Sequence, residues 1–529
     1  MKTPSSLSNL GHFFRRVNSP LCNIDPERPA VKYLDESYSY REMNGRINRV
    51  ANGLLKLGVR KGDKVGVLMY NSISILELFY ALAKVGGVFV PINFRLVAKE
   101  LEYIINNAEC VALAYGHEFS PVVDEIRQNL NVRNYIICGD KTDSGQNSYS
   151  YDEIFGNKSD VFEPAITWDV GLDDLQMIMY TSGTTGLPKG VMFTHSELMW
   201  SAASQMIQYQ YTCRDVTLIN GPLYHVGALV DLSLGTTNAG GCNVITPSLS
   251  FDIEKMIKTV EKEKITNTLL FPVMVIRMFE LANVSDYDFS SLRFAVVGGE
   301  KISPHLLTKF QETFPWTKIY QVYGLTEGSE FVSILDSEHA ISKAGSIGKA
   351  FYNVEIRIVD DNDNDVPQGE VGEIINRSPV TRGGYWKNPE ATAKTFANGW
   401  CHTGDLGRVD EDGFLWIEGR KKEMIRSAGE NIYPAEVENV ISKHPKVLEV
   451  AVYAVPDPVW TEAVMAAVVL KENCAMNAEE VKDFCKDKIA SYKKPKYVVF
   501  LDSLPRTASN KVMKYTLQEK YARIAEESK

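Results

Sequence analysis

Helical and strand-like hydrophobic patterns alternate along the first part of the chain. Apolar residues recur at helical spacing over 39–59, and the apolar run of 63–70 then predicts a buried strand. The segment 73–93 predicts a helix that continues through glycines into another strand, and 99–115 repeats the order of helix and strand. Such alternation favours an α/β architecture with largely parallel sheets.

The same alternation returns in the middle of the chain. The segment 253–272 predicts a helix followed by an apolar strand, and 292–300 predicts a strand that ends in two glycines. A helix is then expected over 302–314, and a short strand from Lys318 leads into a polar turn. The second stretch therefore predicts another α/β region.

The pattern changes from about Gly345 onwards. Apolar residues alternate around an Asp/Asn-rich turn over 348–378, which predicts antiparallel hairpins. Charged residues become dense over 418–434, and shorter helix and strand segments follow. We therefore expect a small α+β domain at the C-terminal end, with the best boundary at Arg420 to Lys422.

Composition and charge exclude several classes of protein. Of the 529 residues, 44% are hydrophobic and 23% are charged, as is typical of an ordinary globular protein. The formal net charge of −10 argues against nucleic-acid binding, which needs a basic surface. The eight cysteines form no C-x-x-C pair, which suits a reducing compartment. The sequence contains no H-E-x-x-H motif, so a structural zinc site is not expected.

Targeting signals also bear on where the protein acts. No run of 18 apolar residues predicts a transmembrane span, and the N-terminus lacks the apolar core of a signal peptide. The last residues, "EESK", differ from the peroxisomal tripeptide. The expectation is a cytoplasmic protein without a transmembrane span.

The first candidate for chemistry is the loop "YTSGTTGLPKG" at 180–190. Its glycines allow close approach of the backbone to a ligand, and its hydroxyls and N–H groups can donate to phosphate oxygens. Lys189 adds a positive charge. The loop differs from the G-x-x-x-x-G-K-[ST] motif because Gly190 follows the lysine. A solvent-exposed loop without a ligand is the alternative for this stretch taken alone.

Two further polar turns suggest a nucleotide. In "YGLTEG" at 323–328, Tyr323 could stack on a base, Thr326 could bond a phosphate and Glu327 could hold Mg²⁺. In "GWCHTGDLG" at 399–407, Asp405 is expected in a glycine-flanked turn, where it could accept two ribose hydroxyls. Taken alone, Asp405 is an ordinary turn residue.

Four motifs occur in one order along the chain: "YTSGTTGLPKGVMFTH" at 180–195, "YGLTE" at 323–327, "HTGDLGRVDEDGFLWIEGR" at 402–420 and "LPRTASNKVMK" at 504–514. In order and rough spacing they resemble the adenylate-forming superfamily, and the chain looks like an acyl-CoA synthetase of that superfamily. The resemblance covers about 29 to 515, and the first two motifs together are its most specific part.

The resemblance implies a fold and a reaction. The fold is α/β, with a large N-terminal domain (1–419) of two αβα-layered subdomains plus a β-rich subdomain. A hinge at 420–422 leads to a small mobile α+β domain (423–529). ATP, Mg²⁺ and coenzyme A are the implied cofactors and co-substrates. A carboxylic acid attacks the α-phosphate to give acyl-AMP and pyrophosphate, and the thiol of coenzyme A then displaces AMP. A homodimer is compatible with the resemblance.

The resemblance also assigns nucleotide and metal contacts. By the resemblance, residues of the first loop bind the β- and γ-phosphates of ATP: Thr181, Ser182, Gly183, Thr184, Thr185, Gly186 and Lys189. Adenine is lined by Gly298, Gly299, Glu300, Tyr323 and Gly324. Thr326 contacts the α-phosphate, Glu327 and Thr184 are the implied Mg²⁺ positions, and Asp405 and Arg420 hold the ribose hydroxyls.

Two assignments fall in the C-terminal part. Lys511 is the implied catalytic lysine for adenylation, since a compact cation can bridge carboxylate and α-phosphate. The alternative is a surface lysine like Lys514 and Lys520, and Asn510 stands where the family usually has glycine. Lys422 falls at the usual hinge. Gly429 would let pantetheine pass close to the backbone, although Ala428 replaces a frequent glycine and could narrow that passage.

The acyl pocket is expected around "PLYHVGAL" at 222–229. By similarity His225 gates the pocket and counts among the catalytic residues. The implied lining is small and aliphatic, which suits an apolar acyl tail: Val226, Gly227, Ala228, Val273, Met274 and Gly324. Taken alone, a histidine near an apolar run is usually a core residue, and helical core packing explains Met274 and Ile276 equally well.

Several functions remain open at this stage. A medium- or long-chain fatty acid is the expected substrate, and aryl or cyclic acids also fit an apolar pocket. One rival is an adenylating enzyme with an acceptor other than coenzyme A. Amino-acid-adenylating relatives place an aspartate near His225, and Asp231 is not far away. A catalytically inactive ligand-binding homologue is the remote alternative, disfavoured because Glu327 and Lys511 are both present.

Overall fold

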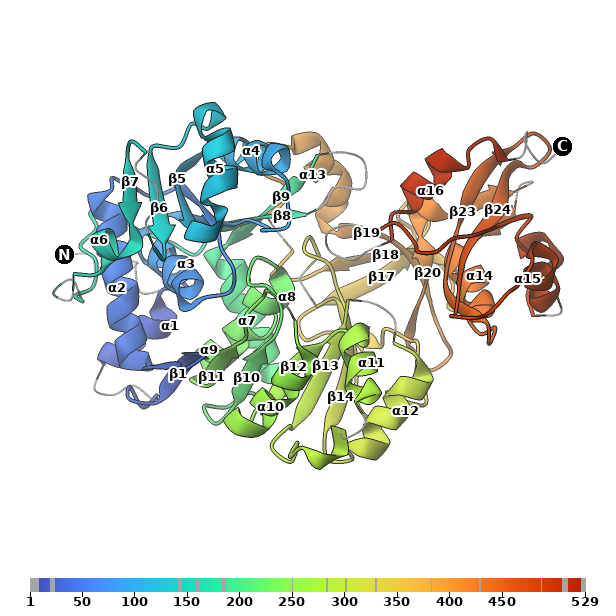
Figure 1. The fold of residues 1–529 in the computed structure, drawn as a ribbon, viewed down its shortest axis with the longest axis horizontal. Helices are drawn as coiled ribbons and strands as arrows, with labels where there is room; N and C mark the ends of the chain where they lie inside the picture. Colours follow the sequence, from blue (N-terminus) through green and yellow to red (C-terminus); the bar gives the residue numbers. More distant parts are fainter. Residues whose placement is uncertain are drawn as a thin grey trace. The chain divides into compact units, whose positions relative to one another are not determined.

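The structure is a computed structural model that describes most of the chain (Figure 1). The described residues are 9–19, 24–140, 145–157, 159, 161–181, 187–249, 251–281, 284–299, 302–328, 331–381, 383–427, 430–486, 488–506 and 512–524.

Two compact units make up the fold. Residues 1–356 and 376–403 form unit 1, and 357–375 with 404–529 form unit 2. A larger N-terminal and a smaller C-terminal part were both expected. The hinge expected at 420–422 lies inside unit 2. Movement of the C-terminal part about this hinge therefore remains a prediction.

The first sheet of unit 1 has seven strands in the order β7-β6-β5-β3-β4-β8-β9. All neighbours are parallel except β8 and β9, which form an antiparallel pair at one edge. The strands are β3 (Lys64–Leu68), β4 (Val88–Pro91), β5 (Cys110–Gly116), β6 (Asn134–Cys138), β7 (Ser148–Ser150), β8 (Leu175–Thr181) and β9 (Lys189–Thr194).

The second sheet of unit 1 has nine strands in the order β16-β15-β14-β13-β12-β10-β11-β1-β2. Its middle is parallel, and antiparallel pairs close both edges. The strands are β1 (Pro29–Tyr33), β2 (Glu36–Ser39), β10 (Val216–Ile219), β11 (Cys242–Ile245), β12 (Asn267–Leu270), β13 (Phe294–Gly298), β14 (Lys318–Tyr323), β15 (Ser333–Leu335) and β16 (Lys349–Ala350).

Helices join these strands in the predicted alternation. Those of unit 1 are α1 (His12–Arg15), α2 (Tyr40–Lys56), α3 (Ile73–Val85), α4 (Ala98–Asn107), α5 (Ser120–Ile126), α6 (Tyr151–Phe155), α7 (His195–Tyr209), α8 (Val226–Leu229), α9 (Ser233–Ala239), α10 (Ile253–Glu263), α11 (Pro272–Glu280), α12 (Pro304–Thr313) and α13 (Pro389–Thr395). The start of α2 shows how neighbouring residues determine where a helix begins. Ser39 accepts a bond from the N–H of Glu42, and the Glu42 carboxylate accepts one from the N–H of Ser39.

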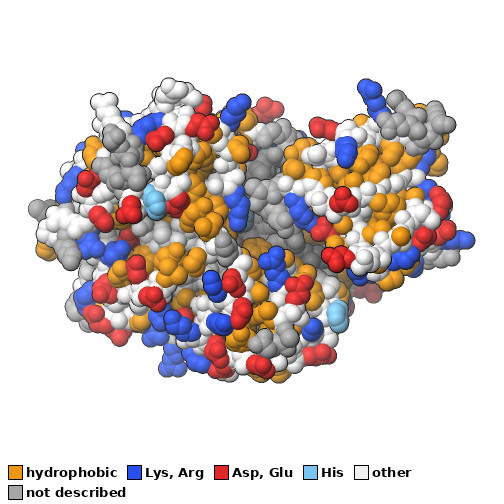
Figure 2. Space-filling model, viewed as in Figure 1, with side chains coloured by type: hydrophobic (Ala, Val, Ile, Leu, Met, Phe, Trp, Pro, Cys, Tyr) orange, Lys and Arg blue, Asp and Glu red, His pale blue; other side chains and the backbone are white. Residues whose placement is uncertain are grey.

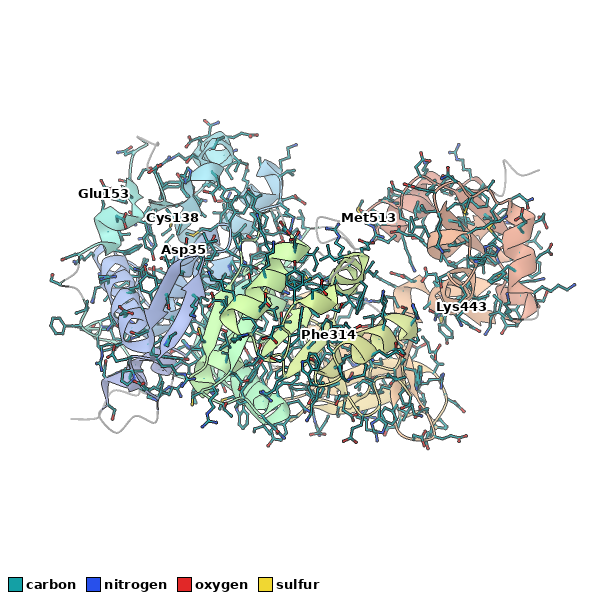
Figure 3. All side chains as sticks on the ribbon, turned by 60° about the horizontal axis from the view of Figure 1, so that its bottom comes forward. Asp35, Cys138, Glu153, Phe314, Lys443 and Met513 are labelled. Carbon is teal, nitrogen blue, oxygen red and sulfur yellow. The ribbon has the colours of Figure 1, made fainter. Side chains whose placement is uncertain are left out.

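Both sheets are covered on both faces. In the first, Phe89 of β4 packs into one core with α2 and α3, while its neighbours Val88 and Val90 pack into another core with α4 and α5. In the second, Val296 and Val297 of β13 divide in the same way, because strand side chains alternate between faces. Phe314, the C-cap residue of α12, belongs to the same core as Val297. Its side chain is labelled in Figure 3. The expected αβα layering is thus confirmed for both sheets.

Unit 2 holds the remaining sheets. Four strands form a sheet in the order β17-β18-β19-β20, of which β17 and β18 lie in the region where hairpins were expected, and a five-stranded sheet follows. The strands are β17 (Glu355–Val359), β18 (Gly372–Arg377), β19 (Cys401–Val409), β20 (Leu415–Arg420), β21 (Ile425–Ser427), β22 (Glu430–Ile432), β23 (Val447–Asp457), β24 (Thr461–Leu470) and β25 (Tyr497–Phe500). The helices are α14 (Pro434–Ile441), α15 (Ala478–Cys485) and α16 (Lys514–Lys520).

Two further features are the length of the helices and the distribution of charge on one face. No helix within the described ranges is long and apolar enough to cross a membrane. On the face shown in Figure 2, Lys and Arg side chains are interspersed with Asp and Glu.

Candidate active site

The central strands of the nine-stranded sheet bring most of the predicted residues of unit 1 to one edge. Strands β10, β12, β13 and β14 are parallel neighbours, so their carboxyl ends lie side by side (Figure 1). The segments after these strands carry, in order, His225 with α8, Phe271 with α11, Gly299, and the turn 324–328. Open α/β sheets bind ligands at this edge.

The predicted adenine residues lie on adjacent strands. Gly298 of β13 pairs with Val322 of β14, which places Gly298 and Gly299 beside Tyr323. A Cβ on Gly298 would meet the Val322 side chain at 2.7 Å, and Gly299 has a φ of +83°, which only glycine adopts readily. Tyr323 is half-buried and Gly324 is exposed. Because Gly298 and Gly299 carry no side chains, this edge of the sheet has space for a ligand.

The side chains of Thr181, Glu327 and Tyr385 form a hydrogen-bonded cluster in unit 1. Glu327 Oε1 accepts a bond from Thr181 Oγ1 at 3.2 Å and another from the Tyr385 hydroxyl at 3.0 Å. Lys189 Nζ lies 5.1 Å from the centre of the Tyr385 ring. Thr181 of the first loop thus contacts the predicted metal ligand, although 146 positions separate it from Glu327. Lys189 lies near the Tyr385 ring of the same cluster.

The first loop connects an antiparallel hairpin. Thr181 at the end of β8 lies opposite Lys189 at the start of β9. The loop therefore joins two strands, whereas a G-x-x-x-x-G-K-[ST] loop joins a strand to a helix. Several predicted residues lie outside the described residues: Ser182, Gly183, Thr184, Thr185, Gly186, Glu300, Gly429 and Lys511.

Tyr385 is a site residue that sequence reasoning missed. Its segment extends the sheet edge beside β9, since the Met192 N–H donates to Gly384 O at 2.9 Å and the Trp386 N–H donates to Gly190 O at 2.7 Å. A Cβ on Gly383 would come within 1.6 Å of Met192 O, so this approach requires glycine. The sequence signal was the pair of glycines in "TRGGYW" (381–386).

Burial keeps the Tyr385 hydroxyl protonated. Burial, and then the Glu327 carboxylate, raise the pKa of Tyr385 well above its ordinary value. The hydroxyl is therefore a donor at every physiological pH and orients Oε1 of Glu327. The other oxygen, Oε2, has no hydrogen-bond partner among the described residues, and the side chain is half-buried. A carboxylate oxygen of this kind is a suitable Mg²⁺ ligand.

Two hydrogen bonds hold the turn that carries Thr326 and Glu327 in place. The Gly328 N–H donates to Leu325 O at 3.1 Å, and Asn376 Nδ2 donates to Gly328 O at 2.6 Å. Thr326 is half-buried on the same turn. Because the turn is closed by its own backbone and held by a buried amide, the Glu327 carboxylate needs little reorganisation to receive a ligand.

His225 begins α8. Its Nδ1 accepts a bond from the Gly227 N–H at 3.2 Å, so His225 acts as the N-cap of the helix, and its side chain is exposed. Val226, Gly227 and Ala228 are buried, and Gly227 packs against Leu269 of β12. The exposed ring excludes the core-histidine alternative, while the gating role remains a prediction.

The predicted residues on α11 divide between surface and core. Val273 is 43% exposed, whereas Met274 is buried and its sulfur lies 3.7 Å from Asn220 Nδ2. Asn220 follows β10, and Met274 lies on α11, which follows β12. The contact therefore links the segments that come after these two strands. Core packing therefore accounts for Met274, and a pocket role for Val273 stays a prediction.

Asp405 and Arg420 meet in unit 2. The two residues are opposite in the β19–β20 pair, and Arg420 Nε lies 2.7 Å from Asp405 Oδ1. The turn expected around Asp405 is wrong: the residue lies within strand β19, because Gly404 and Gly407 are accommodated inside the strand rather than ending it. Arg420 does end β20, as expected, and Lys422 follows in a short 3-10 turn (Lys421–Glu423).

Metal binding at Glu327 fits a ligand-dependent site. No group of three or more His, Cys, Asp or Glu side chains in the described part of the chain is arranged to hold a metal ion. Mg²⁺ is commonly held by one or two carboxylates together with substrate phosphates. One oriented carboxylate beside Thr181 and Lys189 matches that arrangement.

We expect Tyr385→Phe to lower kcat/KM for MgATP by about tenfold, as expected for losing a hydrogen bond to a charged group. The ring would still pack at 5.9 Å from Phe396, so the fold should persist. Steady-state kinetics at varied MgATP would measure the effect, with Tyr352→Phe as a control at an exposed tyrosine. Equal loss in both variants, or no loss in Tyr385→Phe, would contradict the orienting role.

Known proteins show the same organisation. The model of the AMP-binding enzyme family matches residues 22–386, and the model of the AMP-binding enzyme C-terminal domain matches 436–511. A feruloyl-CoA synthase of Amycolatopsis sp is 34% identical over 498 residues, which cover 94% of this chain and 97% of that protein. A long-chain-fatty-acid–CoA ligase of Mycobacterium tuberculosis is 36% identical over 489 residues, covering 92% and 94%.

A solved structure extends the likeness to the fold. The crystal structure of the anthranilate CoA ligase AuaEII in complex with anthranoyl-AMP has a TM-score of 0.87 and 28% identity, and the match covers 98% of each chain. The family models span both the strand-edge site and the C-terminal part. The chain therefore belongs to the AMP-binding enzyme family, among its acyl- and aryl-CoA ligases.

Proposed function

We propose that the protein is an ATP-dependent carboxylic acid–CoA ligase that works through an acyl-adenylate. The acid attacks the α-phosphate of ATP and releases pyrophosphate, and the thiol of coenzyme A then displaces AMP. The hydrogen-bonded cluster of Thr181, Glu327 and Tyr385 carries the proposal, because it joins the first loop to the turn after β14. A binding protein without catalysis has less need of an oriented carboxylate there.

The residues suit the charge that the first step accumulates. A carboxylate is a poor acyl donor, and adenylation supplies a good leaving group at the cost of gathering phosphate charge in one place. Lys189, the hydroxyl of Thr181 and Mg²⁺ at Glu327 would stabilise that charge. Lys511 would bridge the acid and the α-phosphate, and Asp405 with Arg420 would hold the ribose.

The class of acid follows less directly. The α8 segment is apolar and buried, which suits an acyl chain or an aromatic ring equally well. Named relatives act on both kinds, since one is a feruloyl-CoA synthase and another a long-chain-fatty-acid–CoA ligase. We therefore propose an apolar carboxylic acid, with aryl acids on an equal footing with the fatty acids first expected.

The hinge at Lys422 is part of the same proposal. We expect Lys422→Pro to slow thioester formation by at least about tenfold while adenylation stays within about threefold, because proline restricts its own backbone and that of Lys421. Pyrophosphate release would follow the first step and thioester formation from supplied acyl-AMP the second. Lys422→Ala is the control. Equal loss of both steps in the proline variant would contradict a hinge.

Acid-dependent formation of AMP tests the proposed function. The purified protein would be given MgATP with acetate, hexanoate, palmitate, benzoate, a cinnamic acid or an amino acid, with and without coenzyme A. AMP together with a thioester, identified by mass, is the expected result for at least one acid. Acyl-adenylate without thioester would indicate another acceptor. Nucleotide binding without turnover of any acid would favour an inactive homologue.

A further inference from the structure

Asp231 is a buried carboxyl beside the predicted acyl pocket. It follows α8 directly, and its N–H donates to Val226 O at 3.1 Å, which closes the last turn of that helix. The residue is only 6% exposed, and its Oδ1 has no hydrogen-bond partner among the described residues. An unpaired buried polar atom is costly, and such atoms in native proteins usually have a partner.

The carboxyl lies close to the pocket residues on α8. The position that a Cβ on Gly227 would take is 3.5 Å from Asp231 Oδ2, 3.5 Å from His225 Nδ1 and 3.3 Å from Leu269 Cδ2. Asp231 and the His225 ring therefore approach Gly227 within one small region. Gly227 leaves open the space that a side chain would fill there.

Polar atoms on α7 next to this region also lack partners. Gln205 Nε2 donates to Val230 O at 3.0 Å, directly before Asp231, while Gln205 Oε1 has no partner. The Tyr209 hydroxyl, one turn further along α7, is likewise unpartnered and buried. Burial most of all, then Tyr211 and Asp231, raise the pKa of Tyr209 well above its ordinary value. Gln205 Oε1, the Tyr209 hydroxyl and Asp231 Oδ1 thus form a group of buried polar atoms without partners among the described residues.

No described cation neutralises Asp231. Burial raises the pKa of the carboxyl to about 8, so at neutral pH most of it is protonated and uncharged. A neutral carboxylic acid can accept a hydrogen bond and donate one. A hydroxyl or a ring N–H satisfies such a group, whereas an alkyl chain leaves it unpaired.

We propose that Asp231 is a specificity-determining residue that binds an O–H or N–H group on the apolar part of the acid substrate. The inference rests on the proposed ligase function and narrows its substrate class. It favours acids that bear a hydroxyl or ring N–H away from the carboxylate, and it disfavours unsubstituted alkyl acids. Val226, Ala228 and Leu269 provide the apolar surroundings of that contact.

Matched acids test the inference in the wild-type enzyme. The pairs are 4-hydroxycinnamate with 4-methoxycinnamate, and indole-3-acetate with 1-methylindole-3-acetate, together with hexanoate and palmitate. We expect kcat/KM for thioester formation to be roughly tenfold to a hundredfold higher for a donor-bearing acid than for its methylated partner. The two pairs distinguish a hydroxyl ligand from a ring N–H.

Variants show whether Asp231 causes the preference. Asp231→Leu should bring the ratio within the preferred pair close to one, mainly through loss on the donor-bearing acid. Ser233→Ala is the matched control, since it removes another buried, unpartnered oxygen nearby and should leave the ratio unchanged. Thermal melting would check folding. If Asp231→Leu does not fold, two results would together support the role of Asp231. The wild type would prefer the donor-bearing acid, and Asp231→Asn would retain that preference.

The possible results separate this inference from the ligase function. Equal use of the acids within both pairs, or a preference for hexanoate or palmitate, would overturn the role of Asp231 and leave the ligase intact. An equal fall for every acid in Asp231→Leu would assign the residue to folding and overturn it too. No AMP from any acid would instead mean that the ligase function itself had failed.

Discussion

Lys511→Ala is expected to lower acyl-adenylate formation by on the order of a hundredfold to a thousandfold, as removing one donor to a developing charge does in other enzymes. Thioester formation from supplied acyl-AMP should stay within about threefold of the wild type. The difference arises because the lysine bridges carboxylate and α-phosphate only while the anhydride forms. Acid-dependent pyrophosphate release would measure the first step, and thioester formation from synthetic acyl-AMP the second.

Two other lysines provide controls for Lys511. Lys520 is exposed in α16, so Lys520→Ala should leave both steps unchanged. Lys514 pairs with Glu423 at 3.0 Å and with Glu438 at 2.8 Å. Burial opposes its charge, but the two carboxylates outweigh burial and raise the pKa of Lys514. Lys514→Ala should therefore lower stability more than it alters the ratio of the two steps.

A different outcome would reassign the lysine. Equal loss of both steps in Lys511→Ala would make it a structural or general binding residue. Full adenylation activity in Lys511→Ala would indicate that Lys511 is a surface lysine without a catalytic role. A lysine at the end of the segment matched by the C-terminal domain model is compatible with the catalytic role, and only the kinetic separation tests it.

Periodicity in the sequence was enough to predict the alternation of helices and strands in unit 1, whereas the αβα layering was implied by the family resemblance. Strands buried on both faces give continuous apolar runs such as Val88–Pro91, and amphipathic helices give the 3.6-residue period of 40–56. The segment 39–59 expected from its apolar spacing contains α2, which begins at Tyr40 directly after the capping residue Ser39. These signals are local, so they can be read without knowing which segments pack together.

Contacts between distant segments could not be predicted in the same way. Tyr385 reaches Glu327 because Gly383 lets its segment pair with β9, and neither residue type alone signals that contact. Asp405 was expected in a turn because its flanking glycines are common in turns, yet pairing with β20 holds it in a strand. Asp231 was noticed only for its closeness in sequence to His225, since its lack of a partner depends on the tertiary fold.

Glu327→Ala is the second large effect that we expect, with adenylation lowered by about a hundredfold or more at fixed Mg²⁺. The carboxylate would supply the protein's oxygen ligand to the ion that neutralises the phosphates. Its loss should therefore raise the Mg²⁺ concentration needed for half-maximal rate as well as lower the maximal rate. Titrating Mg²⁺ at saturating ATP would measure both quantities, and Glu338→Ala is a control at an exposed carboxylate.

The cluster around Glu327 allows a sharper form of the test. Tyr385 acts by orienting Oε1, so once the carboxylate is gone its hydroxyl has nothing left to position. The double variant Glu327→Ala/Tyr385→Phe should therefore be no slower than Glu327→Ala, because residues that act as one unit are not additive. Multiplied losses in the double variant would show that Tyr385 acts on its own. Unchanged Mg²⁺ dependence in Glu327→Ala would remove the carboxylate from the metal site.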